Sequence, residues 1–155
     1  MTFDDAFAAV VGIEGHDTND PNDPGGYTRF GIAQASHPGV DVPNLTIDQA
    51  KAIYQAGYWA PAGCNFAPDP LKGPLFAAAV NQGVGTAVRI IQRALGVDVD
   101  GVMGPQTCAA LSNADPHDIT ARFTAKQIVN YTQDAGWPHY GEGWAYRVAL
   151  ILSKS

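Results

Sequence analysis

The chain has 155 residues, of which 46% are hydrophobic and 15% are charged, so it is long enough and apolar enough for one compact globular domain. Its net charge of −6 disfavours nucleic acid as a partner, because neutralising phosphates requires clustered Lys and Arg. No stretch approaches the roughly 20 apolar residues of a membrane span, so no stable membrane insertion is expected. The N-terminus MTFDDAFAAVV lacks the basic region of a secretory signal, which predicts synthesis in the cytoplasm.

The first predicted element is a helix that ends on a glutamate. Thr2 and Asp5 form a capping-box pattern, and Phe3, Phe7 and Val10 recur at helical spacing. Glu14 lies eleven positions after Phe3, which places it on the same apolar stripe at about 100° per residue. Burial disfavours the charged form of a carboxyl group and raises its pKa, as a general acid requires. The alternative is a glutamate that caps the helix or pairs with Arg29.

An acidic loop follows, rich in the residues that form turns, and residues 25–33 are expected to form at most a short β-hairpin. A second carboxylate in this loop is suited to hold a water molecule or to stabilise an oxocarbenium-like transition state, and the Thr28 hydroxyl is suited to assist. The alternatives are an acidic surface turn and a calcium loop; Pro24 and Gly31 fit poorly at two of the calcium-ligand positions. The carboxylates available are those of Asp17, Asp20 and Asp23.

Helices dominate the rest of the chain, so the predicted fold class is mainly α. Thr46 and Gln49 open a second capped helix that runs to about Trp59. A Pro- and Gly-rich stretch at 61–73 is the candidate linker. Pro74 is expected at the first position of the next helix and Thr86 at the cap of the one after it. Further helices are predicted at 105–111, 115–135 and 142–152, with a break at residues 137–138.

Several side chains are suited to bind sugar rings. Aromatic rings offer flat apolar faces with a polar edge, although each single ring is more often part of a core. The aromatic candidates are Tyr58, Trp59, Trp137, Tyr140 and Trp144. Asn81 and Gln82 can hydrogen-bond an N-acetyl group, and helix capping or amide bonding in the core is an equal alternative.

The sequence predicts neither a metal nor a cofactor. The four histidines are scattered, and none has a partner at metal-ligand spacing. Cys64 and Cys108 are too few for a disulfide scaffold, and two unlinked thiols are favoured over a single bridge.

Motif blocks spread over nearly the whole chain resemble the glycoside hydrolase family 108 lysozymes, which are phage endolysins and related bacterial N-acetylmuramidases. In the first half the blocks are FDxAF, then Glu14-Gly15, then NDPxDPGGxTxxGI at 19–32. In the second half they are VNQG at 80–83, QxALG at 92–96, DGxxGPxT at 100–107 and GxGWxxRV at 141–148. This second half resembles the predicted peptidoglycan-binding region that usually accompanies the family. The nine-residue step from Glu14 to Asp23 also resembles the catalytic spacing of phage T4-type lysozymes, and Thr28 falls one residue short of the threonine there.

The resemblance implies a lysozyme-like peptidoglycan hydrolase that cleaves between N-acetylmuramic acid and N-acetylglucosamine. Glu14 would be the general acid, Asp23 the water-positioning carboxylate and Thr28 an accessory hydroxyl. It implies a catalytic region at 1–62 and a helical peptidoglycan-binding region at 70–155, packed into one compact unit. The protein is expected to be a monomer that reaches the wall after holin-type release. The alternatives are a lytic transglycosylase and an inactive wall-binding or secretion accessory protein.

Overall fold

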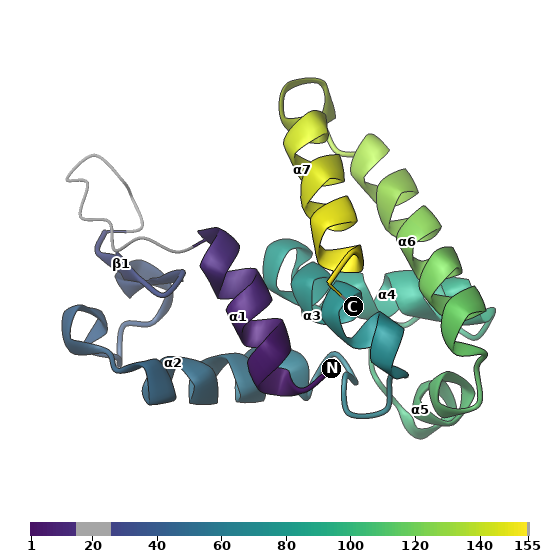
Figure 1. The fold of residues 1–155 in the computed structure, drawn as a ribbon, viewed down its shortest axis with the longest axis horizontal. Helices are drawn as coiled ribbons and strands as arrows, with labels where there is room; N and C mark the ends of the chain where they lie inside the picture. The colour runs from purple at the N-terminus through teal and green to yellow at the C-terminus, as the bar shows by residue number, and fades with distance from the viewer. Residues whose placement is uncertain (15–25, 155) are drawn as a thin grey trace.

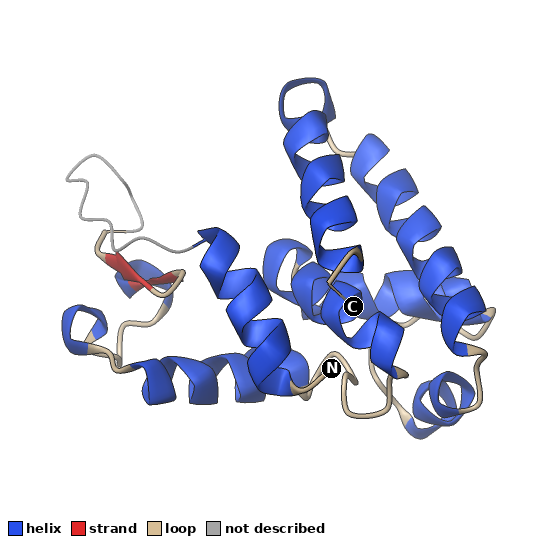
Figure 2. Ribbon diagram, viewed as in Figure 1, coloured by secondary structure: helices blue, strands red, loops and turns tan. Residues whose placement is uncertain are grey.

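The structure is a computed structural model that describes residues 1–14 and 26–154; for 12–14 it describes the backbone alone. Helices form nearly all of it, with one small hairpin, which confirms the mainly α prediction (Figure 2). The helices are α1 (Phe3–Glu14), α2 (Ile47–Tyr54), α3 (Asp69–Gln82), α4 (Val84–Leu95), α5 (Pro105–Ser112), α6 (Pro116–Thr132) and α7 (Trp137–Leu152). Short 3-10 turns occupy Gln34–Ser36 and Val42–Asn44, and a π-helical turn at Gln55–Trp59 extends α2.

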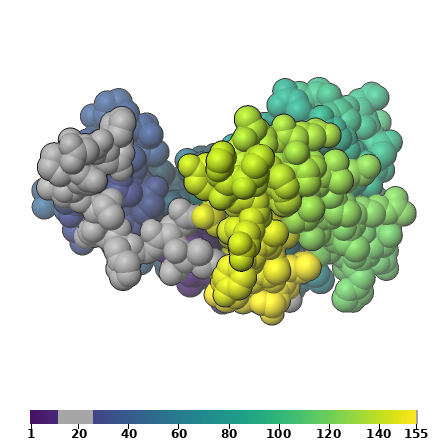
Figure 3. Space-filling view, turned by 90° about the horizontal axis from the view of Figure 1, so that it is seen from above, coloured from purple at the N-terminus to yellow at the C-terminus, as the bar shows by residue number. Residues whose placement is uncertain are grey.

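Helix α3 lies at the centre and packs against α1, α4, α6 and α7. From Leu71 to Ala79 every residue except Lys72 is buried, as expected for a helix surrounded by others. Figure 1 shows α1 between the part that holds α2 and the hairpin and the part that holds α4 to α7. Seen from above in Figure 3, the surface is hollowed between these two parts.

An aromatic cluster joins α1 to α2 and α3. The Phe3 ring lies 5.5 Å from Trp59 and 5.9 Å from Phe76, and the Phe7 ring lies 5.4 Å from Tyr54, measured between centroids. The predicted capping boxes at both helix starts are present: the Thr2 hydroxyl accepts from Asp5 N–H at 3.2 Å, and the Thr46 hydroxyl accepts from Gln49 N–H. Local capping residues therefore determine where α1 and α2 begin, and aromatic packing determines where the two helices lie relative to α3.

The hairpin pairs β1 (Thr28–Arg29) with β2 (Ile32–Ala33) in antiparallel register, with Thr28 opposite Ala33. Its two turn residues have positive φ, 51° at Phe30 and 73° at Gly31. Glycine adopts such values freely, whereas phenylalanine is strained there. The Tyr54 hydroxyl donates to the Phe30 carbonyl at 3.0 Å, and the Arg29 guanidinium lies 5.2 Å from the Phe30 ring, so neighbouring groups hold the turn.

Three predicted helix boundaries were wrong, each at a proline or a glycine. Helix α3 begins at Asp69, inside the predicted linker, because a proline at position 70 is tolerated in a first turn. Pro74 then lies within the helix at the loss of one hydrogen bond. Helix α4 begins directly after Gly83, so Thr86 does not cap it. Helix α7 begins at Trp137 and has Pro138 in its first turn, where the sequence had predicted a break between two helices.

Both cysteines are free in the structure. Cys64 is fully buried, and burial raises the pKa of its thiol far above the usual value. Cys108 is partly exposed on α5. The two unlinked thiols favoured by the sequence are therefore present.

Candidate functional site

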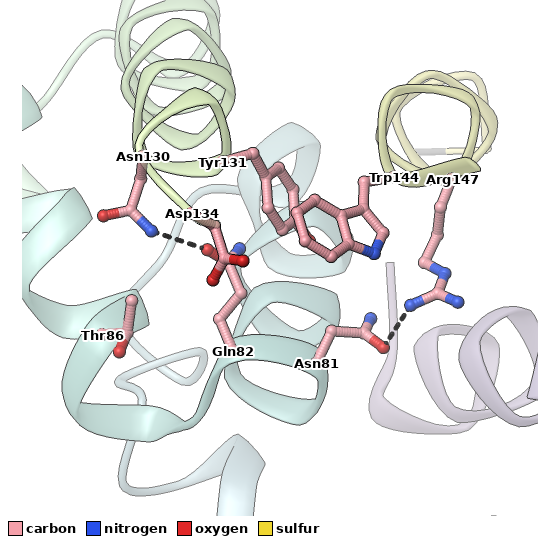
Figure 4. Close-up of a pocket in the computed structure, with 8 residues that line it drawn as sticks. All are labelled: Asn81, Gln82, Thr86, Asn130, Tyr131, Asp134, Trp144 and Arg147. Atoms are coloured by element: carbon pink, nitrogen blue, oxygen red, sulfur yellow. Dashed lines mark hydrogen bonds between the residues drawn. The ribbon is translucent and has the colours of Figure 1, made fainter. Parts of the chain in front are cut away.

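A cavity of about 360 Å³ opens where the end of α3 and the start of α4 meet α6 and α7 (Figure 4). This size lies toward the lower end of the roughly 300–1,000 Å³ common for small-ligand sites. Its lining combines amides, a hydroxyl, two aromatic rings and one charge of each sign: Asn81, Gln82, Thr86, Asn130, Tyr131, Asp134, Trp144 and Arg147. Such a mixture suits a polar ligand with some flat apolar surface.

Two hydrogen bonds to side-chain amides of α3 connect the residues that line this cavity. Asn130 Nδ2 donates to Gln82 Oε1 at 3.0 Å, which ties α6 to α3. Arg147 Nη1 donates to Asn81 Oδ1 at 2.7 Å, which ties α7 to α3, and Asn81 Nδ2 donates to the Ala77 carbonyl at 2.8 Å. Gln82 Nε2 is buried and has no well-formed hydrogen bond among the described residues.

Stacked aromatic rings form one wall of the cavity. The Tyr131 and Trp144 rings stack with their centroids 5.0 Å apart and an angle of 28° between their planes. The centroids of the Tyr140 and Trp137 rings lie 6.0 Å and 6.4 Å from that of Trp144. Burial raises the pKa of the Tyr131 phenol above its usual value. Gly141 leaves room for this arrangement, because a Cβ there would lie 2.7 Å from the Trp137 ring.

The proposed catalytic residues lie largely outside the described part of the structure. Glu14 is the last residue of α1, and its backbone alone is described. Asp23 lies outside the described residues, as do Asp17 and Asp20. Thr28 is partly buried in β1. Helix α1, which ends at Glu14, packs against α3. Helix α3 contributes Asn81 and Gln82 to the cavity from its C-terminal end.

The four predicted substrate-binding residues divide between the core and the cavity. Trp59 is only 4% exposed within the aromatic cluster and donates from Nε1 to Asn65 Oδ1 at 2.7 Å. Its ring therefore has no open face for a sugar, which corrects that prediction. Tyr58 packs against Tyr54 at 5.4 Å at the edge of the same core. Asn81 and Gln82 both line the cavity.

Sequence reasoning missed the contribution of α6. Asn130, Tyr131 and Asp134 come from the last turn of α6 and the residues just after it, where they resemble an ordinary helix end. No local motif marks them, because a cavity lined by residues of four helices has no single sequence spacing. Arg147 did occur in a motif block of the family, without an assigned role, and Trp144, one of the aromatic candidates for sugar binding, lines the cavity.

Within residues 1–14 and 26–154 no group of three or more His, Cys, Asp or Glu side chains could hold a metal ion. The described helices include none with the length and apolarity needed to cross a bilayer.

The sequence pattern of the family described as Glycosyl hydrolase 108 matches residues 7–83. Residues 7–83 are a glycosyl hydrolase 108 domain. The family described as Predicted Peptidoglycan domain matches residues 86–148, in the order that the motif blocks predicted. The chain is therefore a glycoside hydrolase that acts on peptidoglycan.

The fold of the chain, with its glycosyl hydrolase 108 domain, agrees with a solved structure. It is similar to the structure of SagA from Brucella abortus, with 28% sequence identity and a TM-score of 0.84. The match covers 98% of this chain and 92% of that one, so the likeness includes both the family 108 part and the peptidoglycan-binding part. A search of curated proteins found no match.

Proposed function

We propose that the protein is an N-acetylmuramidase that hydrolyses the β-1,4 bond between N-acetylmuramic acid and N-acetylglucosamine. The observation that carries this proposal is the family 108 match at residues 7–83, which includes Glu14, Asp23 and Thr28. The position of Glu14 at the end of α1 supports its assignment as the general acid. Asn81 and Gln82 are the proposed contacts to the substrate's amide groups, because both line the cavity.

In the proposed reaction, the Glu14 carboxyl donates its proton to the glycosidic oxygen while the C1–O bond of N-acetylmuramic acid breaks. A water molecule attacks C1 from the opposite face and gives a proton to the Asp23 carboxylate. The products are two shorter glycan chains, and one molecule of water is consumed. The anomeric configuration is inverted, because water, and not an enzyme carboxylate, forms the new bond at C1.

The proposed role of Thr28 is to hold the attacking water through its hydroxyl. Its strand is short, but the register to Ala33 and the held turn at Phe30 fix its backbone. An accessory group that orients water is effective only when it is itself fixed.

Product analysis in ¹⁸O-labelled water tests the hydrolase assignment. Hydrolysis is expected to leave reducing N-acetylmuramic acid ends that carry one ¹⁸O atom, which mass spectrometry detects as a gain of about 2 Da. A lytic transglycosylase would instead leave a 1,6-anhydro end that takes no oxygen from water. Anhydro ends as the main product would therefore overturn the muramidase assignment.

The proposed biological role is that of a phage endolysin that works as a monomer and reaches the wall through a holin. Its support is the resemblance of the motif blocks at 19–32 and 80–107 to endolysins of the family. Expression in bacteria together with a holin is expected to clear the culture, whereas expression of a catalytically inactive variant with the same holin is not. Equal clearing by both would assign the lysis to the holin alone.

A further inference from the structure

The cavity between α3, α6 and α7 contains charged side chains that the binding of an uncharged sugar ring does not require. Besides the stacked rings of Tyr131 and Trp144, it contains a carboxylate and a guanidinium. In the view of Figure 4, Asp134 and Arg147 lie on opposite sides of this aromatic pair. N-acetylglucosamine is uncharged and unsubstituted N-acetylmuramic acid carries only a carboxylate, so the Asp134 carboxylate has no cationic partner on a bare glycan.

The amide groups of the cavity point to the same kind of ligand. Gln82 Nε2 is buried, and its contact with the Tyr131 phenol falls short of a well-formed hydrogen bond, so this donor is poorly paired within the described residues. A ligand carbonyl oxygen would pair with it. The neighbouring Asn130 amide is already held by Gln82 Oε1 at 3.0 Å, so the pair is arranged in advance. Side-chain amides matched to successive carbonyl and N–H groups are suited to a peptide backbone.

Asp134 is fixed as well as exposed. Its Oδ1 accepts from the backbone N–H of Gly136 at 2.7 Å, which holds the carboxylate in the turn between α6 and α7. The second carboxylate oxygen remains available for an ammonium group. Such charge-assisted hydrogen bonds are about twice as strong as neutral ones.

We propose that this cavity binds the peptide stem that branches from N-acetylmuramic acid. Peptidoglycan stems contain amide bonds, free carboxylates and, at the position of the diamino acid, an ammonium group. Gln82 and Asn130 bind the stem amides, Asp134 binds the ammonium group, Arg147 faces a carboxylate, and Trp144 covers the apolar side. This inference rests on the proposed function, because it assumes that peptidoglycan is the substrate.

Intrinsic fluorescence of the full chain tests the proposal. Of its three tryptophans, Trp59 is buried and Trp144 lines the cavity, so a ligand in the cavity is expected to change the emission. The probes are the disaccharide of N-acetylglucosamine and N-acetylmuramic acid with a tripeptide that ends in a diamino acid, and the same disaccharide without peptide. The peptide-bearing probe is expected to bind at least about tenfold more tightly.

The matched variants are Asp134→Asn and Asp118→Asn. Both remove one exposed carboxylate, one at the cavity and the other in the first turn of α6. Asp134→Asn is expected to weaken binding of the peptide-bearing probe about five- to tenfold, while Asp118→Asn leaves it unchanged. Asn130→Ser provides a second variant, expected to weaken the same probe while the melting curve confirms folding. Equal affinity for both probes, or no effect of Asp134→Asn and Asn130→Ser, would overturn the proposal.

The same assay separates this proposal from the muramidase assignment. Tight binding of the peptide-bearing probe without cleavage of purified walls would support the stem site and contradict the catalytic proposal. Wall cleavage together with tighter binding of the peptide-free disaccharide would make the cavity a glycan subsite and overturn the stem proposal alone.

Discussion

Glu14→Gln is expected to lower the rate of wall hydrolysis by about 10²–10⁴-fold. Glutamine keeps the size and hydrogen-bonding capacity of the side chain but cannot donate a carboxyl proton to the leaving oxygen. The fall in turbidity of purified cell walls and the appearance of new reducing ends measure the effect. Binding of wall fragments is expected to persist, because the change removes an interaction needed chiefly in the transition state.

The sequence provides a matched control for this test. The chain contains only two glutamates, and the other, Glu142, is exposed on α7. Glu142→Gln makes the same chemical change and is expected to retain wild-type activity. A Glu14→Gln protein that cleaves walls within about twofold of wild type would assign the acid to another residue. Asp23→Asn is the next variant to measure, ahead of changes at Asp17 and Asp20.

Gln92→Ala is expected to lower the free energy of unfolding by about 3–5 kcal/mol. Gln92 is 1% exposed on α4, and its Nε2 lies within 2.7 Å of Asp100 Oδ1 and 3.0 Å of the Val102 carbonyl. Its Oε1 accepts from Gly101 N–H at 2.9 Å. Alanine would leave these partners partly unpaired and open a cavity at the end of the loop before α5. Urea unfolding measures the change, and the melting temperature is expected to fall by about 10 °C.

Gln133→Ala is the control for this loss of stability, because Gln133 is exposed just after α6 and is expected to change the free energy of unfolding by less than about 0.5 kcal/mol. A loss below about 1 kcal/mol in Gln92→Ala would show that the loop does not depend on this amide.

The pH dependence of stability offers a second measurement on Gln92. The hydrogen bond from the Gln92 amide is the main cause that lowers the pKa of Asp100 below its usual value, and the hydrogen bond from the Val102 N–H is the second. A carboxyl group whose pKa is lower in the folded state stabilises the fold above its unfolded pKa, and this contribution is lost as the pH falls through the folded pKa. The difference in stability between wild type and Gln92→Ala is therefore expected to narrow under acidic conditions.

The sequence predicted most of the fold because most of its signals are local. Capping boxes at Thr2 and Thr46, the Asp115 cap of α6 and Gly96 at the end of α4 each lie within a few residues of the helix end they specify. The helix boundaries predicted at Pro74 and Pro138 were wrong, because burial at the first and first-turn geometry at the second override the tendency of proline to end a helix.

The cavity was predicted only in part, since its residues are brought together by packing. Asn81 and Gln82 stood out as an amide pair within a motif block of the family. Asn130 and Asp134 did not, because their role depends on the end of α6 meeting the end of α3, and no spacing within the chain encodes that contact. The burial of Trp59 could not be predicted from the sequence either, because a tryptophan at a helix end can face the core or the solvent.

The central position of α3 limits how this enzyme can be recombined in evolution or in engineering. By sequence α3 belongs to the family 108 part, which ends at residue 83, yet its buried face packs against α4, α6 and α7 of the second part. Cutting the chain at this boundary would expose Pro74 and Ala77, which lie beside Gln127, Val148 and Ile151 of the second part. Exchange of the wall-binding half for one from another enzyme therefore has to preserve the surface that accommodates α3. The two halves are expected to be inherited and altered together.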